Sequence, residues 1–135
     1  MYKNILVPIA LEHERDTGGA MIVAHRLLAE GGKITALHVM EAVPGYATQY
    51  LPQGHLESRH SEMLAALKAE LGGVKDVKPV VVSGHSGRSI VEYAEDHDID
   101  CIVIASHRPG LQDYLLGSTA ARVVRHAACA VHVLR

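Results

Sequence analysis

The chain has 135 residues, 48% of them hydrophobic, and its 13 Lys and Arg against 15 Asp and Glu give a formal net charge of -2. This length and composition predict one compact domain over residues 1–135, and the scattered basic side chains argue against a nucleic-acid partner. The longest apolar runs fall far short of the roughly 20 residues of a membrane-spanning helix, and the amino terminus lacks a signal-peptide pattern, so we expect a cytoplasmic protein without a membrane partner.

The first third of the chain shows a strand, a helix and a second strand. Asn4–Ile9 is an apolar run whose end is marked by Pro8, which indicates a central parallel strand. Apolar residues at helical spacing then predict a helix over Glu14–Gly31, terminated by the glycine pair that it runs into. A second strand is expected over Lys33–Met40.

A long connection, Glu41–His55, separates this strand from the next helix. It carries two prolines and two glycines and exceeds the usual loop length, which indicates a functional or a mobile segment. Because it leaves the carboxyl end of a strand, it is placed to close over a ligand there, with Tyr46 or Tyr50 against a ring face. We therefore expect a lid at this end of the sheet.

The rest of the chain continues the alternation of helices and strands. Helices are expected where apolar residues recur at three- and four-residue spacing, and strands where apolar runs are bounded by turn residues. The expected elements are a helix over Leu56–Leu71, a strand over Val77–Ser83, a helix over Arg88–His97, a strand over Ile102–Ala105, a helix over Gly117–Ala128 and a strand over Ala130–Leu134. This alternation predicts the α/β class, with a single doubly wound, parallel sheet and helices on both faces.

The stretch from Cys101 to Thr119 has the pattern of a phosphate-sized site. A polar loop after the fourth strand carries His107 and Arg108 as candidate anion partners. Gly117 lets the backbone approach a ligand, and Ser118 or Thr119 can cap the helix that begins there. Because the first amides of a helix carry partial positive charge, this helix start favours an anion.

Other motifs favour structural roles. Ser83–Gly87 lacks the G-x-S-x-G spacing of a nucleophile elbow, and a capped turn fits it better. The ten histidines form neither H-x-H nor H-E-x-x-H, so no metal site is expected. Cys101 and Cys129 lie in apolar surroundings, which favours two reduced core thiols over a disulfide or a nucleophile. A phosphoacceptor receiver domain would need acidic strand ends, where this chain has Ala10 and Ala105.

Four segments together resemble the universal stress protein family, and the resemblance extends over essentially the whole chain. They are NILVPI, LHV, VEYAEDHDIDCIVIASH and LLGSTAARVVRHAACAVHVL. The resemblance implies a five-stranded parallel sheet of order 3-2-1-4-5, with a ligand crevice where the strand order reverses. Many members bind ATP there, so it also implies ATP or a related adenine nucleotide, with or without Mg. The adenosine half would contact Pro8, Ile9, Ala10 and Val39, and the phosphates would meet His107, Arg108, Gly117, Ser118 and Thr119.

The phosphate loop departs from the signature of ATP-binding members, G-x-x-G-x9-G-S/T. Ala105 and Arg108 occupy the first two glycine positions, and the spacing to Gly117 is one residue shorter. Ala105 stays among the expected binding residues because it occupies a signature position. Ala10 replaces an Asp that the family often has at the end of the first strand. Each lost hydrogen bond to a charged phosphate costs roughly 1.5 to 3 kcal/mol, and a bidentate Arg108 guanidinium would offset such a loss.

Two functions remain open at this point. The first is an ATP-binding stress-response or signalling protein that acts as a homodimer, in which the nucleotide biases the long connection and hence the choice of partner. The second is a family member that has lost nucleotide affinity and works as a dimeric protein-interaction module. Enzymatic activity beyond slow, incidental ATP hydrolysis is not expected from either function.

The expected strand order leaves the third and fifth strands at the edges of the sheet. Lys78 and Pro79 put a charge and a missing donor into the third strand, which suits an edge that faces water. The fifth strand, Ala130–Leu134, has neither feature and places Val131 and Val133 on one face. We therefore predict a two-fold homodimer through antiparallel pairing of this strand, as in many members of the resembled family.

Overall fold

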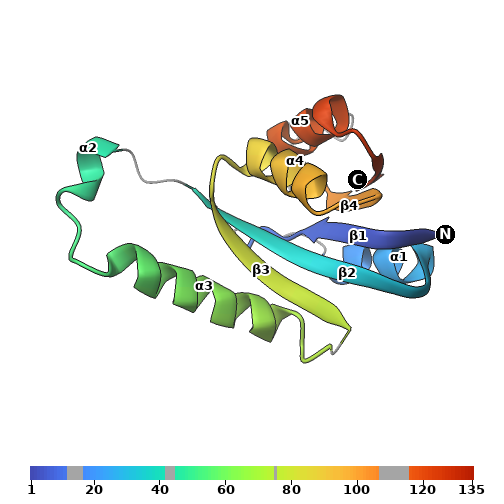
Figure 1. Cartoon of the computed structure of the whole chain (residues 1–135), viewed down its shortest axis with the longest axis horizontal. Coiled ribbons are helices and arrows are strands. Elements are labelled where there is room, and N and C mark those ends of the chain that lie inside the picture. Colours follow the sequence, from blue (N-terminus) through green and yellow to red (C-terminus); the bar gives the residue numbers. More distant parts are fainter. Residues whose placement is uncertain (12–16, 42–44, 75, 107–115) are drawn as a thin grey trace.

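Five strands form one parallel sheet in the order β3-β2-β1-β4-β5, in a computed structural model that describes residues 1–11, 17–41, 45–74, 76–106 and 116–135. The strands are β1 (Tyr2–Pro8), β2 (Leu28–Glu41), β3 (Val77–Gly84), β4 (Cys101–Ala105) and β5 (Ala130–Leu134). The helices are α1 (Thr17–Leu27), α2 (Gly45–Thr48), α3 (His55–Glu70), α4 (Ser86–Asp96) and α5 (Ser118–His126), shown in Figure 1. The predicted α/β class and strand order are confirmed.

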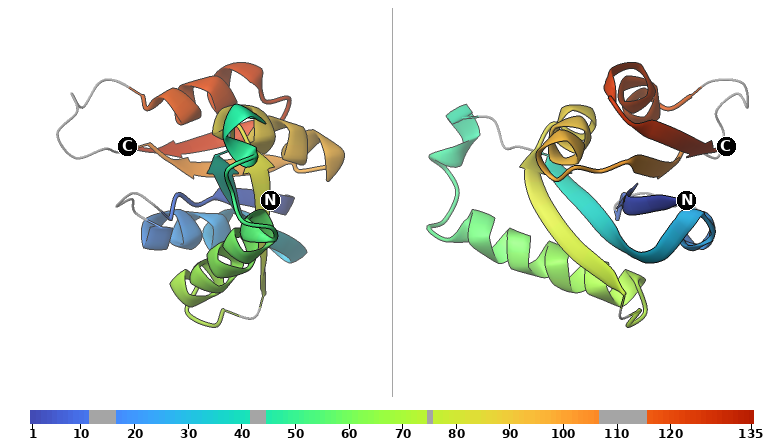
Figure 2. Two further views of the ribbon diagram at one scale, coloured as in Figure 1. Left: turned by 90° about the vertical axis from the view of Figure 1, so that its left-hand side faces the viewer. Right: turned by 45° about the vertical axis from the view of Figure 1, so that its right-hand side comes forward.

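Helices cover both faces of the sheet, which makes three layers (Figure 2). On one face, Ala24 of α1 and Leu67 of α3 are fully buried against β1 and β2. On the other face, Ile90 of α4 and Val123 of α5 are buried against β1, β2 and β4. The central strands are therefore covered on both sides, which is why continuous apolar runs encode them.

The amino ends of β1 and β4 are tied together by one carboxylate. The backbone N–H groups of Lys3 and Asn4 donate to the two carboxylate oxygens of Asp100, over 2.9 and 3.0 Å. The Asp100 N–H donates in return to the Asn4 carbonyl, over 3.0 Å. These bonds hold β4 beside β1, so the strand order reverses at the centre of the sheet.

The first helix ends earlier than its apolar spacing predicts. The pattern predicts a helix up to the Gly31–Gly32 pair, but α1 stops at Leu27 and β2 begins at once. A Cβ on Gly32 would lie 2.6 Å from Leu28 Cδ1 and 3.0 Å from the Lys3 carbonyl oxygen, so the missing side chain lets β2 approach β1. The prediction was wrong because this glycine serves close strand pairing at an irregular register.

The remaining bounds differ from the predictions only at element ends. α4 begins at Ser86, before the predicted Arg88, and α5 ends at His126, before the predicted Ala128. The long connection contains the short helix α2, which lies beyond the carboxyl end of β2 and away from the sheet (Figure 1). In the part of the chain that the structure describes, no helix is both long and apolar enough to cross a membrane.

Candidate functional site

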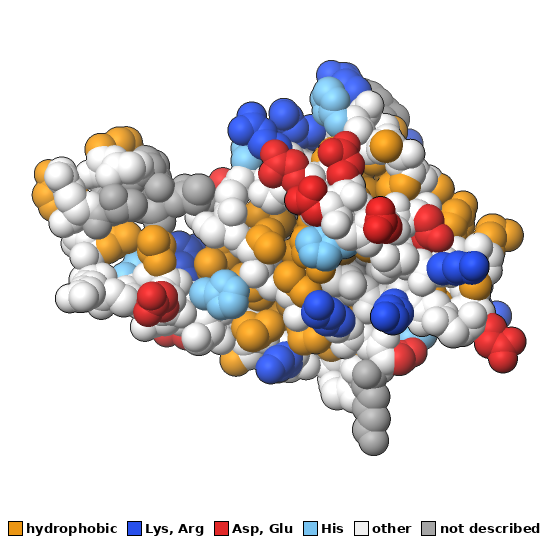
Figure 3. Space-filling model, viewed as in Figure 1, with side chains coloured by type: hydrophobic (Ala, Val, Ile, Leu, Met, Phe, Trp, Pro, Cys, Tyr) orange, Lys and Arg blue, Asp and Glu red, His pale blue; other side chains and the backbone are white. Residues whose placement is uncertain are grey.

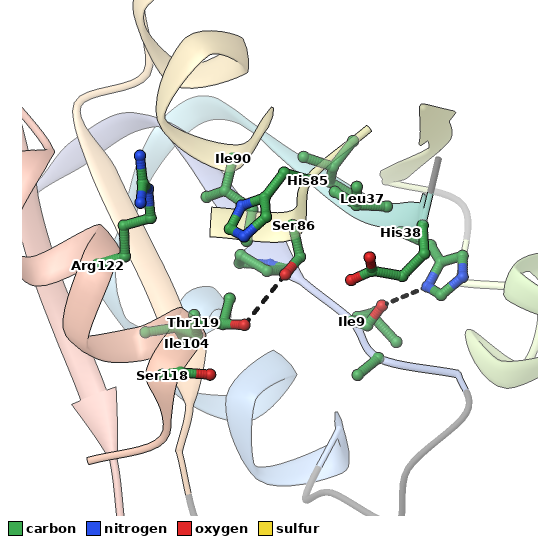
Figure 4. A pocket seen from close by; sticks show the side chains of 14 residues that line it. Ile9, Leu37, His38, His85, Ser86, Ile90, Ile104, Ser118, Thr119 and Arg122 are labelled. Atoms are coloured by element: carbon green, nitrogen blue, oxygen red, sulfur yellow. Dashed lines mark hydrogen bonds between the residues drawn. The ribbon is translucent and has the colours of Figure 1, made fainter. Parts of the chain in front are cut away.

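A cavity of about 430 Å³ lies at the carboxyl end of the sheet, on the face that α4 and α5 cover. β1 pairs with β2 on one side and with β4 on the other, and these strands and both helix starts contribute to the walls (Figure 4). The lining residues are Pro8, Ile9, Ala10, Leu37, His38, Val39, Glu41, His85, Ser86, Ile90, Ile104, Ser118, Thr119 and Arg122. A reversal of strand order is where open parallel sheets bind ligands.

The strand side of the cavity is mainly apolar. Leu37, Val39 and Glu41 lie two residues apart on β2, so they share one face of the strand and form a stripe that ends in a carboxylate. The end of β1 lies beside this stripe, because the Ile9 N–H donates to the Leu37 carbonyl over 2.8 Å. This side suits a flat apolar group, with Glu41 as an acceptor at its outer end.

The helix side of the cavity is polar, and two helices begin on it. The Ser86 hydroxyl of α4 and the Thr119 hydroxyl of α5 are hydrogen-bonded over 3.1 Å, as Figure 4 shows. The N-cap residues, His85 and Gly117, make no side-chain hydrogen bond to their own helices. The partial positive charges of two helix starts therefore face one cavity, which favours an anion there.

Arg122 adds a full positive charge to this side. It follows Ser118 by four residues, about one helical turn, and therefore lies on the same face of α5. A Cβ on Gly87 would lie 2.6 Å from Arg122 Cδ and 3.1 Å from its Cβ. The absence of a side chain at Gly87 thus lets α4 and α5 begin close together. The cavity is cationic at the helices and anionic at Glu41.

His38 of β2 lines the cavity next to the end of β1. It is 3% exposed, and its Nδ1–H donates to the Ile9 carbonyl over 2.8 Å. A carbonyl oxygen can only accept, so Nδ1 carries a proton. Nε2 is buried and has no hydrogen-bond partner among the residues described. The histidine fixes the end of β1 against β2 beside the cavity.

Six of the ten expected binding residues line the cavity, two described ones do not, and two lie outside the described residues. The six are Pro8, Ile9, Ala10, Val39, Ser118 and Thr119. Ala105 and Gly117 are the two described ones that do not; Ala105 is buried, and the Gly117 N–H donates to Ser106 Oγ over 3.0 Å. His107 and Arg108 lie outside the described residues. The expected cap from Ser118 or Thr119 is wrong, because Gly117 is the N-cap residue and Ser118 already belongs to the helix.

Sequence reasoning missed several lining residues, of which His85, Ser86 and Arg122 matter most. The turn Ser83–Gly87 was predicted as a capped turn, yet no side-chain cap forms and it contributes two side chains to the cavity. The position of this turn could have indicated that it lines the cavity. It follows a parallel strand, and the carboxyl ends of parallel strands lie at the same edge of the sheet. The four-residue spacing from Ser118 to Arg122 was a second signal.

Comparison with known proteins decides the family. The model of the universal stress protein family matches residues 1–135. Universal stress protein G of Salmonella typhimurium is 33% identical over 145 residues, which cover 100% of both chains. This chain belongs to the universal stress protein family.

Solved structures agree with this assignment. The universal stress protein UspA from Lactobacillus plantarum superposes with a TM-score of 0.69 at 25% identity, covering 99% of this chain and 98% of that one. A universal stress protein crystallised with cAMP superposes with a TM-score of 0.70 at 17% identity, covering 99% of this chain and 97% of that one. The arrangement of strands and helices is therefore the one found in this family.

Proposed function

We propose that this universal stress protein binds an adenine nucleotide in the cavity at the carboxyl end of the sheet, and acts as a stress-response signalling protein in the cytoplasm, where such nucleotides are available. The main observation behind the proposal is that two helices begin at one cavity, where the Ser86–Thr119 hydrogen bond joins them. The opposite wall of this cavity is apolar. A nucleotide has the matching chemistry, with a flat ring at one end and phosphate at the other.

The proposed pose puts the adenosine on the strand side. Pro8, Ile9 and Val39 offer apolar contact, and Glu41 is an acceptor for ribose hydroxyls or the adenine amino group. The phosphates lie at the first turns of α4 and α5, beside Arg122. Direct contacts of the phosphates with Ala105, His107, Arg108 and Gly117 stay predictions.

The related structures support an adenine nucleotide more than any other ligand. One universal stress protein was crystallised with cAMP, which contains adenine, ribose and a phosphate. That protein shares only 17% identity with this chain, so the proposal depends on the cavity itself. ATP, with or without Mg, is the ligand that the family resemblance implies, and AMP tests the same contacts with one phosphate.

Calorimetric titration of the purified chain with ATP, AMP and adenosine tests the proposal. We expect binding of ATP and AMP, weakened about tenfold in Thr119→Val, because this change removes a hydroxyl from the phosphate end. Val124→Ala is the matched control, since Val124 is exposed on the same helix and does not line the cavity. No binding of any of the three ligands up to about 1 mM would contradict the proposal.

A second function, a dimeric interaction module without a nucleotide, is favoured by the edge of the sheet. β5 pairs with β4 on one side only, and its exposed and half-buried residues alternate along Ala130–Val133. Among the described residues no strand pairs with its other edge, and an edge of this kind invites association. We propose that two copies pair antiparallel through β5, whether or not the cavity holds a nucleotide.

A further inference from the structure

A second hollow, of about 390 Å³, lies at the amino end of the sheet, opposite the end with the proposed nucleotide cavity. Its walls come from the starts of β1 and β3, from residues 33–35 in the middle of β2 and from the end of α4. The residues used below are Asn4, Lys33, Thr35, Lys78, Tyr93 and His97, and we call this hollow the amino-end groove. None of them lines the cavity described above.

The sheet register brings two lysines to this groove. Asn4 of β1 pairs with Lys33 of β2, and Thr35 pairs with Lys78 of β3. Lys33 and Thr35 lie two residues apart, so they share a face with Lys78 and with Leu37, which is buried under α4. On this face of the sheet, buried apolar residues such as Leu37 are therefore followed, towards the amino end, by polar residues that include two exposed lysines.

Two lysines and one aspartate line the groove, so its lining carries a net positive charge. Neither Lys33 nor Lys78 takes part in an ion pair within the ranges that the structure describes. Asp76 also lines the groove, but its carboxylate lies 3.2 Å from the His25 ring nitrogen Nε2 of α1. Figure 3 shows basic side chains over the starts of β2 and β3, beside hydrophobic side chains and a histidine. The groove therefore combines excess positive charge with apolar surface.

The helix wall of the groove carries a stacked pair of rings that hydrogen bonds hold in place. The rings of Tyr93 and His97 are stacked, with centroids 3.8 Å apart and planes 12° apart. His97 Nδ1–H donates to the Tyr93 carbonyl over 3.0 Å, which orients the imidazole. The Asn4 side-chain amide donates to the His97 carbonyl over 2.8 Å and holds the helix end against β1. Burial raises the pKa of the Tyr93 hydroxyl, with a smaller opposing effect from its hydrogen bond to Thr35.

We propose that the amino-end groove is a second ligand site, which binds a small aromatic anion, that is, a planar ring bearing a phosphate, carboxylate or sulfonate. The anionic group lies between the ammonium groups of Lys33 and Lys78, which carry free charge on adjacent strands. The ring lies along the wall formed by Tyr93 and His97, where aromatic contact is favourable. The site does not depend on the nucleotide cavity, because the two share no lining residue.

Titration with three probes, followed by amide NMR, tests this site. Phenyl phosphate carries both the ring and the charge, inorganic phosphate only the charge, and phenol only the ring. We expect phenyl phosphate to bind most tightly and to shift the amide signals of Lys33, Thr35, Lys78 and His97. Saturating adenosine, which has a ring but no anionic group, should leave these shifts unchanged, because it would occupy the cavity at the other end of the sheet.

The double variant Lys33→Gln/Lys78→Gln should weaken phenyl phosphate about tenfold and leave phenol unchanged. Lys68→Gln is the matched control, because Lys68 is exposed on α3, which covers the other face. His97→Ala should weaken phenyl phosphate and leave inorganic phosphate unchanged. Three results would overturn the proposal: no shifts at the groove up to about 10 mM phenyl phosphate, shifts only at Ser86 and Thr119, or equal affinity in the double variant and the control.

Discussion

The hydroxyl oxygens of Ser86 and Thr119 lie 3.1 Å apart, although 33 residues of chain separate them. This hydrogen bond joins the first turn of α4 to the first turn of α5 at the wall of the cavity. The hydroxyl that accepts in this bond keeps its own hydrogen for a ligand, and the hydroxyl that donates can still accept a bond. The pair therefore places two polar groups and two helix starts where an anion would be held, and the predictions below begin from this arrangement.

Arg122→Ala should weaken ATP and AMP about tenfold and leave adenosine unchanged, because only the phosphates can use the guanidinium charge. Arg125→Ala is the matched control, since Arg125 is exposed on the same helix and does not line the cavity. Calorimetry of both variants with the three ligands gives the comparison. Equal loss of adenosine affinity would mean that Arg122 shapes the cavity and does not pair with phosphate.

Gly87→Ala should destabilise the protein by about 1–3 kcal/mol relative to Gly45→Ala, because the added methyl would overpack the contact of α4 with α5. Its Cβ would lie 3.1 Å from Arg122 Cβ, whereas a Cβ on Gly45 would meet nothing within 4 Å. Both changes bring the same helix preference of alanine over glycine. Urea unfolding of the two variants measures the difference, and equal midpoints would show that α5 moves aside without cost.

Cys101 should resist alkylation in the folded protein, because burial raises the pKa of its thiol to about 11 and little thiolate exists at neutral pH. Because the ordinary pKa of a thiol, 9.0, applies in the unfolded chain, the raised pKa also means that stability is lost as the pH rises from 9.0 to about 11. Iodoacetamide labelling with peptide mapping, with and without urea, checks the first point. Urea melts of wild type and Cys101→Ala across this pH range check the second, and parallel pH dependences would contradict it.

The connection after β2 should close over bound nucleotide. Glu41 lines the cavity, while Tyr46 and Tyr50 are 77% and 79% exposed, so two rings are free to cover a ligand. Hydrogen exchange should show new protection over residues 45–55 when ATP is saturating, and none over α3. Tyr46→Ala/Tyr50→Ala should then exchange at the same rate with and without ATP. Unchanged protection in the wild type would assign the segment to another surface role.

The proposed dimer should depend on the free edge of β5. Successive N–H groups of a strand point to opposite sides, so either Val131→Pro or His132→Pro removes a donor from the edge away from β4, and the other disturbs the pairing with β4. We expect one variant to be folded and monomeric and the other to be destabilised. Light scattering and circular dichroism separate these cases. A monomeric wild type at micromolar concentration would contradict the proposed assembly.

Local patterns were enough to predict most elements, whereas the order of the strands was implied by the family resemblance. The inward positions Ile90 and Ala94 follow from helical spacing, and the burial of β4 follows from its unbroken apolar run. The end of the first helix could not be predicted in this way. Two consecutive glycines, Gly31 and Gly32, are typical of the end of a helix. In the structure, however, Gly32 lies close to Lys3 of the neighbouring strand. A glycine pattern alone does not distinguish these two uses.

The sequence by itself determined the family, the alternation of strands and helices, and the end of the sheet at which a ligand would bind, because these depend on periodicity and on matched motifs along the chain. Only the tertiary structure decided which polar side chains share the cavity. Ser86 and Arg122 come from different crossovers, and they line one cavity because Gly87 lets α4 pack closely against Arg122 of α5. Likewise, Lys33 and Lys78 became neighbours only through the register of β2 and β3. Such contacts between distant segments depend on packing, which no local pattern encodes.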